Sequence, residues 1–522
     1  MKRKIVIGAV AACCICGIAL SVLGRRKDPE PEADLSVWYP GGYEILSKKE
    51  LNDVEAVVEM ENRLGISCDF SGVTGKLDSA FQTQMLDLEG VDAVFYRFSP
   101  EQLRSSWENG QILDYTKYLN QMPNLTRLFE ENPLLYQYAS VDGKCLFFPA
   151  IRENDFREEL LAVRRDWMEQ TGMTEIENLS DLEKLFQSER MLFEEGKLRG
   201  QGEYFVGLSS WNGYIEKLLR VFGTSKGLYW DEGELVYGPS TDEYREYLTW
   251  MKDLYQKKLL DANVYETETT AFEKYFLNGT SGAILTTGEH AARLERYSEV
   301  NGDDIVLEYI NLDKLSEEAA IYQPDDRAMQ VLEFGFVINA EIGEEKLEKI
   351  LKVIDYLYSD EGMELLNWGI PEEHWIMQDG RRVYREELAG TQESYEAAMA
   401  PYVKPDMLRT DRTTALNMLA ESPRRAVLEG TEVQDYSFDC PRGYYTPEEQ
   451  EWIEQHEVSL STFVEETTMN FIYKSIDPAD DEDWQDYLDT LKSFGVEEYV
   501  KIQESAYSRM SQRVFDGTQD LG

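Results

Sequence analysis

The sequence has little positive charge. Its 522 residues include 52 Lys and Arg against 100 Asp and Glu, so the net charge is 52 − 100 = −48. Proteins that bind nucleic acids need basic side chains to displace counterions from the phosphate backbone, and basic patches also carry peripheral binding to anionic lipid. We therefore expect no nucleic acid partner and no basic lipid-binding patch.

Catalytic signatures are also scarce. The chain has three histidines, His290, His374 and His456, which leave little room for a histidine-based triad or metal centre. It contains no GxSxG, HExxH or Walker A motif, and no GxGxxG after a predicted strand. Residues 477–483 are strongly acidic but lack the central glycine of an EF-hand loop, so we predict a solvated helix start there. The sequence favours a protein that is not an enzyme and holds no cofactor or metal.

Cysteine is rare outside the N-terminus. Three of the six cysteines lie within one apolar N-terminal run, and Cys68, Cys145 and Cys440 remain for the body of the chain. These three are far apart and none belongs to a CxxC motif, so a zinc or thioredoxin-like site is not expected. We predict isolated buried thiols, with one disulfide as the alternative.

The one long hydrophobic run is at the N-terminus. Residues 5–24 carry no charge and follow Lys-Arg-Lys, which is typical of an export signal. At about 1.5 Å per residue the run reaches about 30 Å, enough to cross a bilayer. Val10–Cys13 resembles a bacterial lipobox, in which Cys13 is lipidated; an uncleaved signal anchor is the alternative. Both predict a body on the extracellular side of the cell membrane, held by residues 1–34 as anchor and acidic tether.

The body alternates between short apolar runs and helical periods. Apolar residues spaced three and four apart predict helices over 347–357 and 484–494. Strands separated by helices predict an α/β fold with parallel sheets, and the length favours two lobes. The predicted strands are Leu35–Pro40, Val91–Tyr96, Tyr204–Leu208, Gly282–Thr287 and Phe334–Asn339.

Several segments resemble a known family in the same order along the chain. They are Asp142–Pro149, Val163–Gly172, Leu179–Phe186, Tyr356–Ile370, His374–Trp375 and the tail Thr446–Tyr507. Asp142-Gly-Lys-Cys-Leu-Phe-Phe-Pro149, for example, is similar to that family's DGK-x-Y-x-x-P segment. Together they resemble the extracellular solute-binding proteins, family 1, of ABC importers, in the branch of large lipoproteins related to LplA-type and alginate-oligosaccharide-binding proteins.

The chain departs from that branch in two segments. Members often carry a calcium loop rich in Asp, Asn and Gly after the third segment, whereas Gln187–Glu203 has no such loop. The family's Gly-Ile-Glu-Gly becomes Gly369-Ile-Pro-Glu372, which loses the second glycine and adds the stiffness of proline. The first departure agrees with the expectation of no metal.

The resemblance implies a two-lobed type II periplasmic-binding-protein fold whose hinge consists of three crossings. We place these crossings near Phe147–Pro149, Phe336–Asn339 and Ser359–Glu361. The N-terminal lobe is then 35–148 plus 338–359, and the C-terminal lobe is 149–337 plus 360–522. Such lobes close on a ligand by hinge motion, and a permease would recognise the closed form.

Candidate ligand contacts follow from the chemistry of sugars. Aromatic rings stack on the apolar faces of a sugar, and charged or amide groups bond its hydroxyls. Ligands of open α/β sheets lie beyond the carboxyl ends of strands. The candidates at such positions are Trp38, Tyr39, Tyr96, Arg97, Arg152, Trp211, Asn212, Tyr214, Glu289, His290 and Trp368. The alternative is core packing for each aromatic residue and an ordinary ion pair for each arginine.

The sequence therefore predicts a monomeric, membrane-tethered extracellular solute-binding protein. It would capture an oligosaccharide in an interlobe cleft and deliver it to an ABC permease. A binding protein for a peptide or another solute is one alternative. An extracellular carbohydrate-active hydrolase is the alternative from another class.

Overall fold

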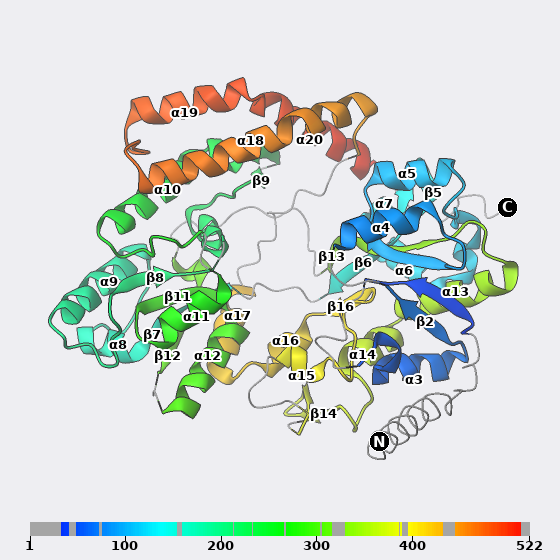
Figure 1. Ribbon diagram of the computed structural model, residues 1–522, viewed down its shortest axis with the longest axis horizontal. Helices are drawn as coiled ribbons and strands as arrows, with labels where there is room; N and C mark the ends of the chain where they lie inside the picture. Colours follow the sequence, from blue (N-terminus) through cyan, green and yellow to red (C-terminus); the bar gives the residue numbers. More distant parts are fainter. Residues whose placement is uncertain are drawn as a thin grey trace, which may run out of the picture.

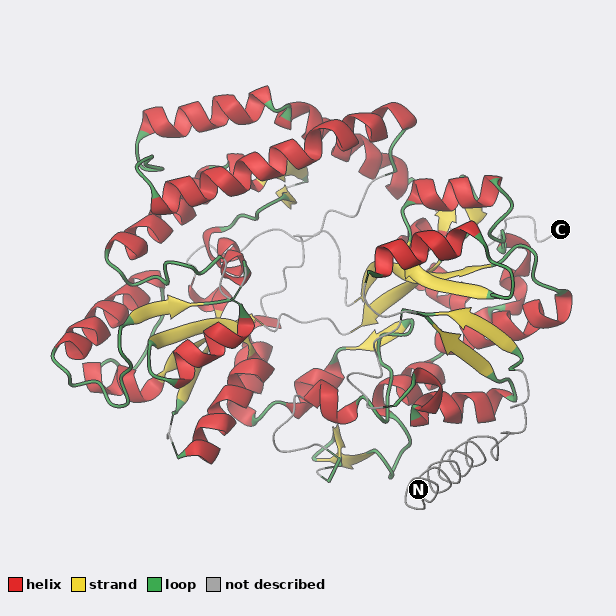
Figure 2. Cartoon of the chain, viewed as in Figure 1, coloured by secondary structure: helices red, strands yellow, loops and turns green. Residues whose placement is uncertain are grey.

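Two separate β-sheets form the framework of the protein, on the right and left of Figure 1. The computed structural model describes residues 33–40, 49–72, 76–153, 159–211, 213–231, 233–265, 268–302, 305–315, 329–385, 387–388, 395–431 and 444–512. Helices lie on both faces of each sheet (Figure 2). The predicted α/β fold with two lobes is confirmed.

The sheet of the first lobe, the N-lobe, has six strands in the order β16-β6-β13-β3-β1-β2. All of them are parallel to one another except β13, which runs antiparallel between β3 and β6. Their bounds are β1 Leu35–Trp38, β2 Cys68–Ser71, β3 Ala93–Arg97, β6 Phe148–Glu153, β13 Met329–Ile338 and β16 Arg409–Asp411.

The sheet of the second lobe, the C-lobe, has four strands in the order β12-β7-β11-β8. Here β7 is the antiparallel strand, between β11 and β12, and β8 is parallel to β11. Their bounds are β7 Glu159–Arg164, β8 Val206–Ser209, β11 Ser281–Thr287 and β12 Leu307–Asn311.

The two antiparallel strands mark where the chain changes sheet. Strand β7 follows β6 directly in the sequence, and β13 follows β12, so the chain passes between the sheets over 154–158 and again before Met329. A third passage leads from Asp411 to the helices α16 (Thr413–Met418) and α17 (Glu421–Thr431), which pack with the C-lobe sheet. Three connections between two sheets is the expected arrangement.

The positions of the connections differ from the expected ones. Phe147–Pro149 lies at the start of β6 and Phe336–Asn339 at the end of β13, both within the N-lobe sheet. Ser359–Glu361 begins helix α14, whose Leu365 and Leu366 pack in the N-lobe core. The lobe boundaries at 148/149, 337/338 and 359/360 therefore need correction. Local hydrophobic pattern reveals a strand but not the sheet that it joins.

Side chains alternate between the two faces of the N-lobe sheet. Leu35, Val37 and Tyr39 point into the larger core, whereas Trp38 points into the smaller one. The helices of the larger core are α3 (Glu55–Leu64), α6 (Pro123–Glu131), α7 (Pro133–Ala139), α13 (Glu344–Leu357) and α14 (Asp360–Trp368). Those of the smaller core are α4 (Leu77–Leu86) and α5 (Pro100–Glu108).

The C-lobe sheet is covered in the same way. Leu161 and Val163 of β7 face one core, and Leu160 and Ala162 face the other. The first core contains α8 (Arg165–Thr171), α9 (Leu179–Glu194), the 3₁₀ helix η3 (Tyr214–Phe222) and α10 (Asp242–Gln256). The second contains α11 (Thr269–Leu277), α12 (Gly288–Asn301), α16 and α17.

Three C-terminal helices run across both lobes at the top of Figure 1. They are α18 (Pro447–Tyr473), α19 (Asp481–Ser493) and α20 (Val496–Ser511). Buried Lys252 of α10 donates hydrogen bonds to the carbonyls of Phe471, Lys474 and Ile476, so it fixes the end of α18 to the C-lobe. At the other end, Met510 of α20 packs in the N-lobe core. The C-terminal helices thus belong to both lobes.

Smaller elements complete the fold. The hairpins are β4 (Ser140–Val141) with β5 (Lys144–Cys145), β9 (Leu228–Asp231) with β10 (Glu234–Tyr237), and β14 (Trp375–Gln378) with β15 (Arg381–Tyr384). The remaining helices are η1 (Leu51–Asp53), η2 (Thr116–Gln121), η4 (Gly238–Ser240), η5 (Leu312–Leu315) and α15 (Tyr395–Met399).

Two predictions about the termini and thiols fall partly outside the described residues. The anchor segment 1–32, with Cys13, lies outside them, and so does Cys440. Within the described part, no helix combines the length and apolarity that crossing a bilayer requires. Cys68 and Cys145 are buried free thiols, as predicted. Burial raises the pKa of each to about 12, so both remain protonated at neutral pH.

Candidate functional site

The carboxyl ends of the parallel strands meet the interlobe connections in both lobes. In the N-lobe sheet, Glu153 pairs with Met329, so the end of β6 lies beside the start of β13. In the C-lobe sheet, Thr287 pairs with Glu159, so the end of β11 lies beside the start of β7. We call the ends of β1, β3 and β6 the N-lobe edge, and the ends of β8, β11 and β12 the C-lobe edge. These are the edges at which α/β proteins bind ligands.

A group of polar side chains surrounds Tyr39 at the N-lobe edge. The Tyr39 ring is buried and stacks on Phe95 with a centroid distance of 4.7 Å, and the Lys404 ammonium lies 5.2 Å from its centre. Lys404 forms an ion pair with Asp406. Burial raises the pKa of the Tyr39 hydroxyl, and the charge of Asp406 raises it further. The phenol therefore remains protonated beside a carboxylate.

Asp406 offers a carboxylate that a ligand can reach. Many protein atoms crowd the carboxyl, which raises its pKa, but the charges of Lys404 and Arg152 outweigh this and lower the pKa overall. Its side chain is nevertheless 68% exposed, so solvent reaches the carboxyl. Arg152 is exposed on the same edge. A carboxylate and a guanidinium on one edge suit the hydroxyl pairs of a sugar.

Trp38 and Tyr96 lie in the core. Trp38 is 5% and Tyr96 8% exposed, and both pack with Phe81 of α4, whose ring stacks on Tyr96 at 4.4 Å. The Tyr96 hydroxyl donates a 2.7 Å hydrogen bond to Asp78. Burial and the Asp78 carboxylate raise the pKa of Tyr96 to about 12. Because Trp38 and Tyr39 are neighbours on one strand, they point to opposite faces of the sheet.

Arg97 remains accessible at the end of β3. Its side chain is 55% exposed, with the guanidinium 5.0 Å from the centre of the Phe334 ring and 4.0 Å from Glu333. A contact of this length is weak, so Arg97 keeps most of its hydrogen-bonding capacity for a ligand.

Trp211 forms an aromatic cluster at the C-lobe edge. Its half-buried ring stacks on His290 at 4.8 Å and lies 4.6 Å from Tyr214 and 5.4 Å from Phe272. His290 is 8% exposed and bonded at both ring nitrogens, to Thr286 at 3.0 Å and to Glu273 at 2.8 Å. Burial lowers the pKa of His290, so the imidazole is neutral. The histidine supports the Trp211 ring from behind.

The Thr286–His290–Glu273 chain resembles the hydrogen-bond order of a hydrolase triad. Thr286 is, however, fully buried, so its hydroxyl cannot reach a substrate. Glu273 also bonds Arg293 at 2.6 Å, which holds its charge in place. This arrangement is suited to fixing α11, α12 and β11 together rather than to nucleophilic attack.

The three remaining candidates, Glu289, Trp368 and Asn212, differ in how exposed they are and in whether the structure describes them. Glu289 is half-buried in the first turn of α12 beside His290, where burial raises the pKa of its carboxyl. Trp368 has no exposed surface and donates a 2.9 Å hydrogen bond to Asp411, so the structure places it in the core. Asn212 lies outside the described residues.

Two buried arginines at the edges were missed from the sequence. Arg409 is bound to Glu153 at the end of β6, and Arg220 lies between Glu159 and Asp313, at 3.2 Å from each. Burial raises the pKa of Glu159, but Arg220 and Lys217 overcome this and bring it to about 2. Each arginine joins the end of one connection to a neighbouring element. Nothing in the local sequence marks these long-range pairs, since charge alone does not reveal burial.

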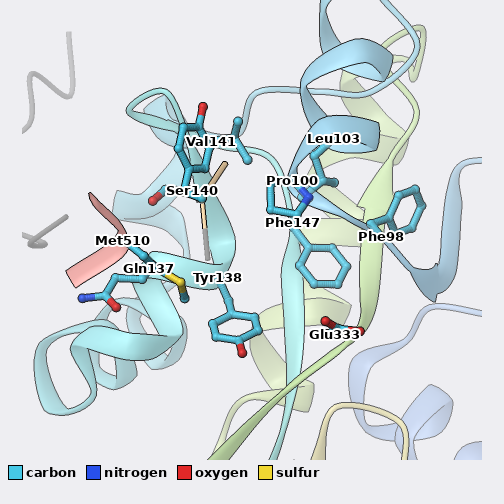
Figure 3. Close-up of a pocket in the computed structure, with 11 residues that line it drawn as sticks. Phe98, Pro100, Leu103, Gln137, Tyr138, Ser140, Val141, Phe147, Glu333 and Met510 are labelled. Atoms are coloured by element: carbon cyan, nitrogen blue, oxygen red, sulfur yellow. The ribbon is translucent and has the colours of Figure 1, made fainter. Parts of the chain in front are cut away.

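One small cavity lies behind the N-lobe edge (Figure 3). It measures about 30 Å³, room for one or two water molecules and too small for a sugar. Phe98 and Phe147 line it from the sheet side, and Met510 enters from α20. Among all described residues, no three His, Cys, Asp or Glu side chains lie close enough together to hold a metal ion.

Comparison with known proteins gives the fold and a set of relatives. No model of a protein family matches the chain. It is similar to lipoprotein LipO of Bacillus subtilis (strain 168), with 22% identity over 284 residues, 52% of this chain and 54% of that protein. It is also similar to the fructooligosaccharide ABC transporter substrate-binding protein FusA of Streptococcus pneumoniae serotype 4, with 22% identity over 249 residues, 44% and 45% of the two chains. The chain thus spans about half the length of the curated relatives it matches.

A solved structure extends the likeness to nearly the whole chain. An HMO-binding, ABC-transporter-associated solute-binding protein from Bifidobacterium longum infantis superposes with a TM-score of 0.70 and 14% identity, over 93% of this chain and all of that one. The protein therefore has the two-lobed fold of periplasmic binding proteins, and ABC-transporter substrate-binding proteins are among its relatives, as the sequence motifs predicted.

Proposed function

We propose that the protein is a membrane-tethered extracellular solute-binding protein that captures an oligosaccharide between its lobes for an ABC permease. The observation that carries this proposal is the arrangement of the two edges. Both sheets turn the carboxyl ends of their parallel strands toward the connections. One edge offers the open Asp406 carboxylate and Arg152, and the other offers the Trp211 ring.

The chemistry of the edges supports a sugar as ligand. A half-buried tryptophan supported by a neutral histidine gives a rigid ring for stacking, and carboxylate and guanidinium groups bond hydroxyls in pairs. The relative FusA is named for a fructooligosaccharide, and the structural neighbour is named for HMO binding. Both names support an oligosaccharide over a peptide.

The arginine pairs support a role for lobe movement. Arg409 and Arg220 hold the ends of β6 and β7 firmly within their own lobes. Each sheet therefore remains one rigid body up to the connection. Movement of the lobes about the connections would bring the two edges together on a ligand, as in hinge closure. The membrane tether rests on residues 1–34 and on the likeness to lipoprotein LipO.

The test is a thermal-shift screen of residues 28–522 against neutral mono- and oligosaccharides, with a peptide mixture as a second ligand class. We expect one group of oligosaccharides to raise the melting temperature, and Trp211→Ala to reduce that rise. Tyr204→Ala is the matched control, because Tyr204 is 49% exposed at the opposite end of the β8 segment. A response to peptides alone, or equal losses in both variants, would contradict the proposal.

The same assay addresses the hydrolase alternative. Incubating the protein with each oligosaccharide that binds, followed by analysis of the products, should return intact ligand. The buried position of Thr286 leads to this expectation, since the triad-like chain has no exposed nucleophile. Product that forms with wild type and disappears in Glu273→Gln would show catalysis instead.

A further inference from the structure

A pocket of about 530 Å³ lies between the C-lobe and the C-terminal helices. On one side it is bounded by η3, β10 and α10, and on the other by α18 and α20, the helices at the top of Figure 1. Its volume falls within the range of small-molecule sites. The residues that line it are Gly213, Glu216, Lys226, Gly227, Tyr237, Tyr244, Tyr265, Glu457, Leu460, Ser461, Val464, Glu465, Thr468, Met469 and Tyr499.

The pocket holds one tyrosine hydroxyl that has no hydrogen-bond partner among the described residues. Tyr237 is 6% exposed, and its hydroxyl makes no hydrogen bond to any described residue. The other tyrosines of the pocket are bonded: Tyr244 to Thr468 at 2.8 Å, Tyr265 to Tyr247 at 2.9 Å and Tyr499 to Glu457 at 3.2 Å. Because tyrosine hydroxyls in largely buried side chains usually find a hydrogen-bond partner, the Tyr237 hydroxyl is available to a ligand.

The charges around the pocket select against acids. Glu216, Glu457 and Glu465 contribute three carboxylates, whereas Lys226 is the one basic side chain of the lining and pairs with Glu216 at 2.9 Å. Burial raises the pKa of Tyr237, and the charges of Glu457 and Glu465 raise it further, so its hydroxyl remains a donor. An anionic ligand would meet uncompensated negative charge, whereas hydroxyl or ammonium groups would meet acceptors.

The pocket lies next to the C-lobe edge, because the chain segment after Trp211 contributes to its lining. Gly213 lines it and lies between Trp211 and Tyr214, whose rings are 4.6 Å apart. A ligand stacked on Trp211 would therefore lie beside the chain segment that lines the pocket. The ring of Tyr499, edge-on to Tyr237 at 5.9 Å, adds apolar surface on the opposite wall.

We propose that this pocket is a subsite for one sugar unit that carries no acidic group, either neutral or amino-substituted. The proposal rests on the proposed function, since it takes the pocket as the continuation of the Trp211 edge. Tyrosine rings enclose the sugar unit, and the carboxylates accept hydrogen bonds from its hydroxyl or ammonium groups. The Tyr237 hydroxyl donates a hydrogen bond to one of its oxygens. The pocket thereby sets the charge class of the oligosaccharide.

The experiment is a calorimetric titration of residues 28–522 with three probes: neutral fructo-oligosaccharides, chitosan oligomers as amino sugars, and oligogalacturonates as acids. We expect affinity for the neutral or amino probes and none for the acids. Tyr237→Phe should weaken binding by about three- to tenfold, the loss of one neutral hydrogen bond, with an unchanged apo melting temperature. Tyr204→Phe is the matched control and should bind as wild type does.

A charge reversal gives the second arm. Glu465→Lys, at an exposed position on α18, should weaken chitosan binding and give measurable oligogalacturonate binding. Wild-type preference for oligogalacturonates would overturn the proposal. Wild-type affinities in both Tyr237→Phe and Glu465→Lys, with weakened binding in Trp211→Ala, would also overturn the proposal. In that case the proposed function stands without this subsite. Binding of no sugar, or full binding in Trp211→Ala, would overturn the proposed function itself.

Discussion

Arg409 on β16 forms a bidentate ion pair with Glu153 at the end of β6. Its Nε donates to one carboxylate oxygen and its Nη2 to the other, each at 2.8 Å. The remaining nitrogen donates to the carbonyl of Tyr358 at 2.7 Å and to Asp360 at 2.9 Å. Arg409 is 5% exposed, so this bidentate pair is shielded from solvent. It joins the strand before the first connection to the strand before the third.

Breaking this pair should unfold the protein more readily. Arg409→Gln leaves the Glu153 carboxylate, whose side chain is only 14% exposed, without its partner, which costs about 3–5 kcal/mol of folding free energy. The exposed Arg97, 4.0 Å from Glu333, is the matched control, and Arg97→Gln should cost far less. Urea unfolding of the two variants measures both values. Equal stability of Arg409→Gln and wild type would show that the pair does not hold the N-lobe edge together.

Glu189 should make stability depend on pH. The side chain has no exposed surface and neither carboxyl oxygen has a hydrogen-bond partner, so burial raises its pKa well above the usual range, while Arg164 acts in the opposite direction. A raised pKa favours the folded state below the unfolded pKa of about 4.3, and this contribution is lost as pH rises through the folded pKa. The stability lost is about 1.4 kcal/mol for each pH unit that separates the folded pKa from the unfolded one.

Glu189→Gln removes this titration. Relative to wild type, the variant should therefore gain stability as the pH rises above the unfolded pKa, until the folded pKa of Glu189 is passed, when melting temperatures are compared at each pH. A difference between the two proteins that stays constant over this range would mean that Glu189 does not change its protonation on unfolding.

Tyr96 should behave as a core residue. The sequence placed it among the ligand contacts, but its ring stacks on Phe81 and is almost fully buried. Tyr96→Ala should lower stability by about 3–5 kcal/mol through the cavity that it leaves. Trp211→Ala should cost less stability, because that ring is half-buried, and more affinity. Calorimetry of the apo variants checks the order, and an unchanged melting temperature in Tyr96→Ala would return it to the site.

The anchor can be resolved by one substitution at the N-terminus. The uncharged residues 5–24 predict that the full-length protein fractionates with membranes. Cys13→Ala should abolish incorporation of a labelled fatty acid if Cys13 is the lipidated residue, and should change nothing if residues 5–24 act as an uncleaved anchor. Full-length wild type in the cytosolic fraction would contradict both forms of the tether.

The sequence predicted the secondary-structure elements better than it predicted which residues lie close together in the fold. A short continuous apolar run located β11, and a helical pattern located α13, to within a few residues, because burial leaves a local pattern in the sequence. Which residues come together was harder. Asp406 and Tyr39 are separated in the sequence by most of the chain, so their proximity leaves no local pattern. One face of α18 lines the pocket and shows helical spacing, but the sequence does not reveal which element packs against it. That face carries Glu457, Leu460, Ser461, Val464, Glu465 and Thr468. That face was the one available signal for the pocket.

The most direct test of a ligand held between both edges is the dissociation constant measured by calorimetry for wild type, Asp406→Asn and Trp211→Ala. The probe is the oligosaccharide with the largest thermal shift. We predict that each variant weakens binding, Asp406→Asn by about tenfold through a lost charge-assisted bond and Trp211→Ala by about thirtyfold through a lost stacking contact. Loss of affinity at one edge with wild-type affinity at the other would contradict this arrangement, since the ligand would then bind to a single lobe.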